Sequence, residues 1–493
     1  MHAHACRFVE ISLLCLLAGA CGADSAAPDG AADSSPALLD AVTRDAATLD
    51  AGQPDAGQPD AGAPEAALPD TTSPDLPPPV CGDGVINGKE TCDKAQLGGQ
   101  SCATLGFDNG ALKCKGDCTF DTAACFSVLD SAGIALTTGQ TSQEFPRVAW
   151  DGANFLVVWE DGYAVRGARV STAGVVLDKT PFFIRPYQVG KSEAGNPKLA
   201  CDGAGCLVVW WDNRGGTVDI YGNRVTQAGA VLDDTGFAIS SAAGDQFNPA
   251  VAFDGTRYVV AWDDKRSGSK PDIYAARVST SGAVLDKAGI AVCAAADGQF
   301  IPAVAGGSKG FLVAWTDQRA SIKGDIYAAR VSGAGSVLDP GGVAVAADAR
   351  AEEGAAVAWD GANFLVVWQH DHYPNVWDVR GARFSPAGKL IDTSSVGVCT
   401  DPLNQHSPAL AFDGARYQVV WSGWYANKAY DIAGARISVG GQVEPQSQTV
   451  IASTPENQLV PAVAAGGGKL LVVWQDKRSG AIKNDIYAAR LGQ

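Results

Sequence analysis

The chain has 493 residues and a formal net charge of −17, and its Lys and Arg residues form no cluster. Nucleic-acid binding needs clustered positive charge, so the composition argues against a nucleic-acid partner. The length exceeds that of one ordinary domain, although a barrel or a propeller would absorb most of it. No apolar run reaches the roughly 18 residues that a membrane-spanning helix requires.

Residues 1–20 have the pattern of an export signal: a weakly basic start, an apolar run from Ile11 to Leu17, and small residues before Cys21. The segment from Leu17 to Cys21 resembles a bacterial lipobox. That resemblance implies cleavage before Cys21 and lipidation of its thiol. We therefore expect a cell-envelope protein, an outer-membrane lipoprotein that faces the exterior and touches the membrane through its lipid anchor only. Plain secretion is the alternative.

Residues 21–80 are rich in Ala, Asp and Pro and hold eleven acidic residues against one basic residue, Arg44. Such a segment buries too little apolar surface to offset its ordering entropy, so the sequence predicts a disordered linker. Prolines stiffen it and like charges extend it, which suits a stalk.

Residues 81–125 contain six cysteines: Cys81, Cys92, Cys102, Cys114, Cys118 and Cys125. An even number of cysteines in a short exported segment predicts three disulfides, with the pairing open. Zinc is the weaker alternative, because no histidine lies nearby and no Cys-x-x-Cys pair occurs. The segment from Cys81 to Asp93 resembles the cysteine-rich repeats of myxobacterial exported proteins, which implies a location and no particular activity.

Residues 126–493 repeat seven times. An apolar run ends in a tryptophan at Trp159, Trp210, Trp262, Trp315, Trp368, Trp421 and Trp474. A later run ends in an arginine at Arg169, Arg224, Arg277, Arg330, Arg383, Arg436 and Arg490. A period near 50 residues with only strand-like segments predicts an all-β fold, a seven-bladed β-propeller of four-stranded blades.

The third repeat shows the expected strands: Ala250–Phe253 (A), Tyr258–Trp262 (B), Ile273–Val278 (C) and Val284 to Val292 (D). The last repeat ends after strand C. The segment Val128 to Ile134 matches Val284 to Ile290, so we expect this N-terminal strand to complete blade seven and close the ring. The repeats resemble uncharacterised propeller lipoproteins of myxobacteria, a likeness that covers residues 126–493.

Positions repeated in most blades favour architecture over ligand binding. Acidic and arginine residues of the B–C loops are expected to staple each loop internally: Asp212, Arg214 and Asp219; Asp264, Arg266 and Asp272; Asp317, Arg319 and Asp325; Asp476, Arg478 and Asp485. Recurring glutamines are expected three residues before strand A, where they would line the mouth of the central channel: Gln143, Gln246, Gln299, Gln405 and Gln458.

Blades five and six depart from this pattern. His370 and His372 replace the staple residues, and His406 lies in the next D–A loop on the same face. These three imidazoles are a candidate metal site, and chance placement is the alternative. Nearby aromatic residues are candidates for stacking on sugar rings or for anchoring the loops: Tyr373, Trp377, Trp424, Tyr425 and Tyr430.

Cys201 and Cys206 flank a tight turn and are expected to form a cross-strand disulfide, whereas Cys293 and Cys399 are expected as buried thiols. The sequence contains no nucleophile elbow, no metalloprotease helix motif and no isolated carboxylate pair outside the repeated positions. We therefore expect a monomeric recognition module that binds an extracellular glycan or protein partner through the B–C and D–A loops. No cofactor is expected, and a divalent metal stays open. The alternatives are an extracellular hydrolase or lyase with its site at blades five and six, and a spacer in the envelope.

Overall fold

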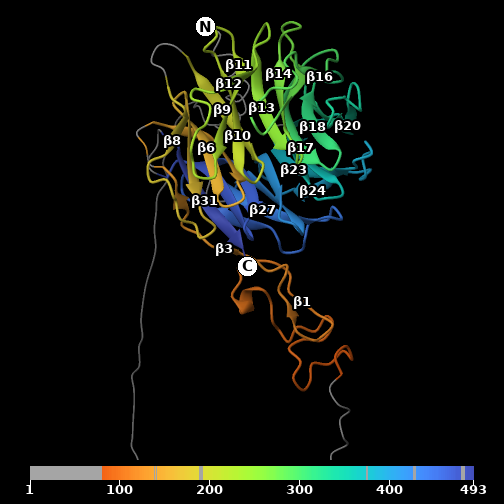
Figure 1. The fold of residues 1–493 in the computed structure, drawn as a ribbon. Helices are drawn as coiled ribbons and strands as arrows, with labels where there is room; N and C mark the ends of the chain where they lie inside the picture. The colour runs from red at the N-terminus through yellow and green to blue at the C-terminus, as the bar shows by residue number, and fades with distance from the viewer. Residues whose placement is uncertain are drawn as a thin grey trace, which may run out of the picture. The chain divides into compact units, whose positions relative to one another are not determined.

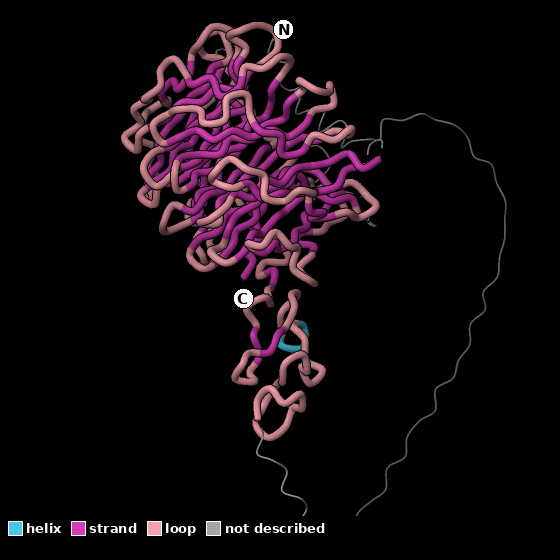
Figure 2. The backbone as a smooth tube through the Cα atoms, turned by 90° about the vertical axis from the view of Figure 1, so that its right-hand side faces the viewer, coloured by secondary structure: helices cyan, strands magenta, loops and turns pink. Residues whose placement is uncertain are grey.

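A computed structural model of the chain describes residues 80–492, apart from 138, 140, 188–191, 374–375, 426–428 and 479–482. The predicted export signal, the lipidation site Cys21 and nearly all of the acidic linker lie outside the described residues, so they stay predictions. Residues 126–492 form a seven-bladed β-propeller (Figure 1), which confirms the predicted fold. Figure 2 shows that strands make up most of this domain. Within the described residues, no helix is long and apolar enough to cross a membrane.

Each blade is an antiparallel sheet whose strands A to D follow chain order. Blade one contains β5 (Gln143–Trp150), β6 (Phe155–Asp161), β7 (Ala164–Val170) and β8 (Phe182–Arg185). Blade two contains β9 (Ala194–Cys201), β10 (Gly205–Asp212), β11 (Asp219–Thr226) and β12 (Phe237–Ser240). Blade three contains β13 (Gln246–Phe253), β14 (Tyr258–Asp264), β15 (Asp272–Val278) and β16 (Ile290–Cys293). Blade four contains β17 (Gln299–Gly307), β18 (Gly310–Asp317), β19 (Asp325–Ser332) and β20 (Val343–Ala346).

The remaining three blades continue the pattern. Blade five contains β21 (Glu352–Trp359), β22 (Phe364–Tyr373), β23 (Val376–Phe384) and β24 (Val396–Cys399). Blade six contains β25 (Gln405–Phe412), β26 (Arg416–Trp424), β27 (Tyr430–Ser438) and β28 (Thr449–Ala452). Blade seven contains β29 (Gln458–Gly466), β30 (Lys469–Asp476) and β31 (Asp485–Gly492), completed by β3 (Ser127–Val128) and β4 (Ile134–Ala135).

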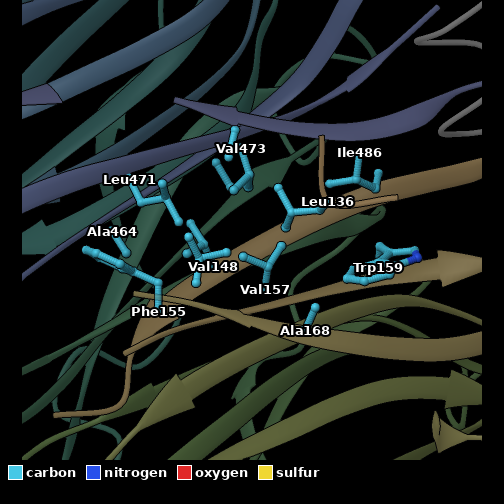
Figure 3. Packing of buried hydrophobic residues seen from close by; sticks show 13 residues of the cluster. Leu136, Val148, Phe155, Val157, Trp159, Ala168, Ala464, Leu471, Val473 and Ile486 are labelled. Atoms are coloured by element: carbon cyan, nitrogen blue, oxygen red, sulfur yellow. The ribbon is translucent and has the colours of Figure 1, made fainter. Parts of the chain in front are cut away.

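The core lies between neighbouring blades. The B strands are near-continuous apolar runs because both of their faces are covered by adjacent sheets. The tryptophan of every B strand is almost completely buried. Figure 3 shows the packing of blade seven against blade one, where Leu136 and Trp159 join Val473 and Ile486 in one cluster.

The A strands begin earlier than the sequence predicts, at Gln246 instead of Ala250 in blade three. A β-bulge between Phe247 and Ala250 allows this, with Asn248 in the left-handed region at φ 48°. The D strands are shorter than predicted, and β16 begins only at Ile290. The recurring glutamines therefore open strand A instead of preceding it.

The predicted ring closure is confirmed. Val128 pairs with Leu491 and Ile134 pairs with Ala488, so β3 and β4 supply the missing outer strand of blade seven. Arg490 and Asp130, which are 360 positions apart, form an ion pair of 2.8 Å between Nε and Oδ2.

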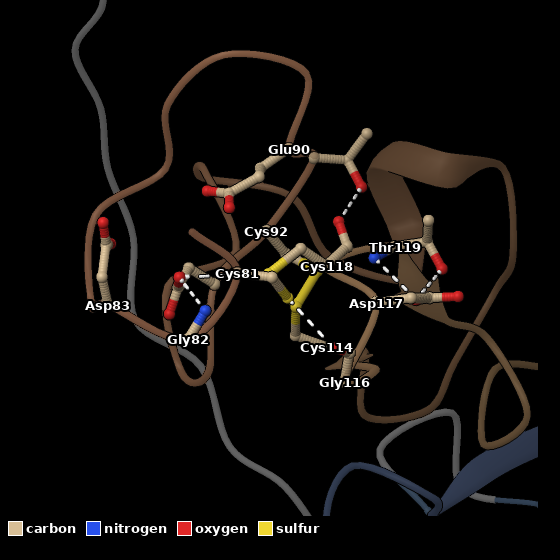
Figure 4. Close-up of a disulfide and its surroundings, with 12 residues drawn as sticks. Cys81, Gly82, Asp83, Glu90, Cys92, Cys114, Gly116, Asp117, Cys118 and Thr119 are labelled. Carbon is tan, nitrogen blue, oxygen red and sulfur yellow. Dashed lines mark hydrogen bonds between the residues drawn. A yellow bond between two sulfur atoms is a disulfide. The ribbon is translucent and has the colours of Figure 1, made fainter. Parts of the chain in front are cut away.

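The segment before the propeller is held by disulfides instead of an extended core. Its elements are short: the 3-10 turn η1 (Ala103–Leu105), β1 (Lys113–Cys114) and β2 (Phe120–Asp121). The six cysteines form the disulfides Cys81–Cys118, Cys92–Cys114 and Cys102–Cys125. Figure 4 shows the first of these beside the turn in which the Asp117 carboxylate accepts hydrogen bonds from Thr119. The six sulfurs are paired with one another, as the disulfide prediction expects.

Two faces of the propeller carry its loops. We call the face with the B–C and D–A loops the top face, and the face with the A–B turns and the C–D loops the bottom face.

A fourth disulfide joins the paired residues Cys201 and Cys206. Cys293 and Cys399 are free and buried.

Candidate functional site

The top-face loops of four blades are closed by the same internal ion pair. In blade three, the Asp264 carboxylate accepts hydrogen bonds from Trp262 Nε1 at 2.7 Å and from Arg266 Nη2 at 2.6 Å. The Arg266 guanidinium lies over the Tyr274 ring at 3.9 Å. The third predicted staple residue, Asp272, pairs in register with Asp264 but bonds to Ser267, outside the ion pair. Blades two, four and seven repeat this ion pair with Asp212, Asp317 and Asp476.

The glutamines that open the A strands also bind their own loops. Gln246 is fully buried, and its Nε2 donates to the carbonyls of Ala242 at 3.2 Å and Gly244 at 2.9 Å. Gln299 binds Ala296 and Asp297 in the same way. The glutamines are thus loop braces and do not line an open channel mouth.

Blades five and six lack the Asp–Arg staple. Blade one retains a version of it, in which Arg166 Nε lies 2.6 Å from Asp161 Oδ2. In blade five, His370 stands where five other blades have aspartate, and Glu352 stands where five other blades have glutamine. The strand register proves the equivalence, because Glu352 pairs with His370 as Gln299 pairs with Asp317.

Glu352 and His370 form a buried pair, with 3.0 Å between Oε1 and Nδ1. Glu352 exposes 1% of its surface and His370 4%. Burial raises the pKa of Glu352 to about 7; the His370 hydrogen bond opposes that rise and the nearby Asp348 carboxylate adds to it. Oε2 of Glu352 and Nε1 of Trp368 have no hydrogen-bond partner among the described residues.

The structure does not gather the three candidate metal-binding histidines. His372 Nδ1 lies 3.5 Å from Asp378 Oδ2, and His406, in strand β25 instead of the predicted D–A loop, packs between Trp377 of blade five and Tyr430 of blade six. Instead, ligand atoms of Asp348, Glu352 and His370 lie within 4.8 Å of one another. Two carboxylates and an imidazole are a donor set suited to a divalent cation of intermediate hardness. His370 therefore stays a candidate metal ligand, with Asp348 and Glu352 as its partners in place of His372 and His406.

The candidate aromatic residues lie mainly in strands, because β22 and β26 continue beyond the tryptophans that recur in every blade and reach Tyr373 and Trp424. Four rings form a row: the centroids of Trp377 and His406 are 6.0 Å apart, those of His406 and Tyr430 5.9 Å, and those of Tyr430 and Trp424 4.9 Å. His406 and Tyr430 are buried in this row, whereas Trp377 and Trp424 are half-buried.

The other two candidate aromatics contribute less to this surface. Tyr425 packs against the hydrophobic core between blades five and six, as a loop anchor would. Of Tyr373, only the backbone in β22 is described.

Burial lowers the pKa of His406 to about 4, so its imidazole is neutral at physiological pH. Amide oxygens fix the strands on either side, since Asn404 Oδ1 accepts from Trp377 N and Asn457 Oδ1 accepts from Tyr430 N, both at 3.0 Å.

Sequence reasoning missed Glu352 and Asp348. The signal for Glu352 was present in the repeats, since the glutamine recurs in five blades and the equivalent position of blade five is this glutamate. Asp348 carries no repeat signal, because D–A loops differ from blade to blade.

The fold defines the class: this is a seven-bladed β-propeller with a disulfide-rich N-terminal segment. No family model matches the sequence, and no curated protein matches it either. Solved propellers are similar in fold. A protein of unknown function from Dyadobacter fermentans DSM 18053 is 11% identical with a TM-score of 0.44, covering 74% of this chain and 99% of that one.

Two further solved structures are of known kinds. TolB from Acinetobacter baumannii is 15% identical with a TM-score of 0.36, over 65% of this chain and 68% of that one. A thermostable family-43 glycoside hydrolase is 10% identical with a TM-score of 0.33, over 50% of this chain and 88% of that one. Likenesses this distant concern the fold alone, so the function has to be argued from the site.

Proposed function

We propose that this chain is an extracytoplasmic recognition protein that binds a glycan at the top face of blades five and six. The observation that carries the proposal is that blades five and six lack the top-face ion pair that the other blades repeat. In five blades an arginine pairs with the aspartate that ends strand B, whereas Arg380 of blade five pairs with Asp378 of strand C. The two blades without the strand-B pair are adjacent, so their exceptional side chains form one continuous sector.

The chemistry of this sector suits a hydroxyl-rich ligand. The half-buried rings of Trp377 and Trp424 offer apolar faces, and Asp348 and His372 are exposed polar groups of the same sector. Sites of this kind combine aromatic surface with a few oriented polar groups. A divalent cation held by Asp348, Glu352 and His370 would add a ligand for sugar hydroxyls.

The location agrees with an extracellular or periplasmic role. Four disulfides are described, and such bonds persist in oxidising compartments. Lipidation of Cys21 and a linker over residues 21–80 would hold the propeller away from a membrane surface, which is how a receptor for external glycans is best displayed. A protein partner at the same sector is the alternative occupant.

A hydrolase is the second candidate, favoured by one observation. Asp348 and Glu352 have carboxyl oxygens within 4.8 Å, and their pKa values move in opposite directions, downward for Asp348 and upward for Glu352. Such pairs divide acid and base roles in glycosidases. However, Glu352 is almost completely buried, so a glycosidic oxygen cannot reach it in this conformation. Binding is therefore the better-supported function.

A glycan array probed with the purified chain, with and without a chelator, tests the proposal. Binding should be specific and should be lost in Trp377→Ala and Trp424→Ala. Trp359→Ala is the matched control, because Trp359 is a half-buried tryptophan at the other end of blade five. An array on which nothing binds, or on which the control loses binding equally, would reject the glycan proposal.

A further inference from the structure

The bottom face carries a second departure from the repeat, at the arginine that ends strand C. In six of the seven repeats this arginine holds an aspartate carboxylate with two parallel hydrogen bonds. In blade four, Arg330 Nε donates to Asp339 Oδ2 at 2.8 Å and Nη2 donates to Oδ1 at 2.7 Å. The other pairs are Arg169–Asp178, Arg224–Asp233, Arg277–Asp286, Arg383–Asp392 and Arg490–Asp130.

Blade six has lost the aspartate. Its C–D loop starts like the others, since Glu444 N donates to Arg436 O at 2.8 Å just as Leu338 N donates to Arg330 O at 2.8 Å. The next residue, which is aspartate in the other blades, is Pro445. Ser447 Oγ accepts the hydrogen bond from Arg436 N at 3.1 Å, a bond that an aspartate oxygen accepts elsewhere.

Among the described residues, no carboxylate forms an ion pair with the Arg436 guanidinium, and Asp413 and Glu444 act on it only from a greater distance. Glu444, the nearest acidic residue in sequence, is paired with Arg416 at 3.2 Å. Arg436 exposes only 4% of its surface, and its Nε has no hydrogen-bond partner among the described residues. The Phe126 ring covers one face of the guanidinium at 3.9 Å. Burying a guanidinium without an ion-pair partner costs free energy, which suggests that an anion from outside the chain pairs with Arg436.

Arg436 lines a cavity of about 660 Å³ on the bottom face, between the A–B turns of blades six and seven. Gly414 and the run Gly466 to Gly468 contribute walls without side chains, and Arg416 lines the same cavity. Asp413 is also in the wall; its Oδ1 accepts from the backbone N–H groups of Ala415 and Arg416 at 2.8 Å, which orients the carboxylate toward its own turn. The volume lies in the range of sites that bind small molecules.

We propose that this cavity binds a small molecule through a carboxylate, which takes the place of the aspartate that blade six lacks. The planar guanidinium matches a carboxylate with two parallel bonds, the arrangement that the six other repeats display within the chain itself. Phe126 covers one face of the guanidinium, and Arg436 is among the residues that line the cavity. The site lies on the face opposite to the proposed glycan sector, so the two proposals stand or fall separately.

Isothermal titration of the full chain with glucuronate and with succinate tests the site, and the two probes separate an acidic sugar from a dicarboxylate. Glucose is the neutral control. At least one of the two carboxylates should bind, and glucose should not. Pro445→Asp restores the internal partner of Arg436, so it should weaken carboxylate binding at least about tenfold, the equivalent of one charge-assisted hydrogen-bonded pair.

Pro445→Asn is the matched control for that variant, because it makes the same backbone change without the charge and should keep binding. Pro445→Asp should also raise Tm, so weaker binding could not be ascribed to unfolding. The proposal is overturned if neither carboxylate binds, if phosphate binds and both carboxylates do not, or if Pro445→Asp binds as tightly as Pro445→Asn.

Discussion

Gln369 of blade five accepts a hydrogen bond from the backbone N–H of Ser407 in blade six, with 3.2 Å between Oε1 and N. Ser407 sits in the bulge of strand A at φ 54°, where the strand register shifts and its N–H has no partner across the ladder. The same link joins other blades, as from Phe145 N to Gln475 Oε1. In five of the seven blades, the residue after the repeated tryptophan accepts a hydrogen bond from the bulge of the next blade.

Replacing Gln369 with leucine should destabilise the propeller by about 1–3 kcal/mol, because the buried Ser407 N–H would lose its acceptor. Denaturant unfolding measures the change. Gln369→Glu keeps an acceptor oxygen and should cost clearly less when both variants are measured at about pH 5, where the buried carboxyl is protonated. Equal losses in the two variants would show that the amide link does not matter.

Replacing Asp130 with asparagine should lower Tm by weakening the pair with Arg490, at a cost of about 1–3 kcal/mol. Asp286→Asn removes the equivalent pair inside blade three. Both variants should lose similar stability, but only Asp130→Asn should speed proteolysis near residues 126–136, because only there does the pair hold a chain segment that closes the ring. Identical proteolysis of the two variants would contradict closure by this strand.

Glu352 should make the chain less stable as the pH rises from about 4.5 to about 7. Its pKa is about 7 in the folded chain against 4.5 when unperturbed, so the unfolded chain gives up its proton first and ionisation favours unfolding. Burial raises the pKa of Glu353 to about 7 as well, which acts in the same direction. Glu352→Gln should flatten the slope in part and stabilise the chain at pH 8. An unchanged slope would mean that Glu352 does not titrate there.

Protonation of His406 should destabilise the folded chain as the pH falls, which is the opposite pH dependence to that of Glu352. Its ordinary pKa of 6.5 falls to about 4 in the folded chain, so stability is complete above pH 6.5 and is lost as the pH falls toward 4. NMR titration of the imidazole should give a pKa near 4. His406→Phe preserves the row of rings and should reduce the acid-side loss of stability. A measured pKa near 6.5 would show that the imidazole is solvated and would contradict its burial between the aromatic rings.

Cys293 and Cys399 should resist alkylation in the native chain. Burial raises the pKa of both thiols, that of Cys399 to about 12, so little thiolate exists at neutral pH. A thiol reagent should label both residues after unfolding and neither before it. Rapid native labelling of either residue would show that its blade opens locally.

The sequence predicts the blades well because each repeats a local pattern seven times, and it predicts closure because the segment after Val128 matches a D strand. It did not predict the bulges, since Asn248, Ile301 and Ser407 share a backbone conformation but no side-chain chemistry. The candidate site was predicted in outline only. His370 and His406 lie on neighbouring blades, but His370 bonds to Glu352 and His406 packs between Trp377 and Tyr430, and the acidic partner Glu352 comes from pairing across strands.

The central claim is that the top face of blades five and six binds a glycan, and the most direct test is a titration calorimetry comparison with the best glycan from the array. The account predicts that Trp377→Ala weakens binding by about tenfold or more, as expected when about 1.4 kcal/mol of ring contact is lost. Trp359→Ala should bind as the unmodified chain does. Equal affinity of Trp377→Ala and the unmodified chain would contradict the claim and move the ligand site elsewhere on the molecule.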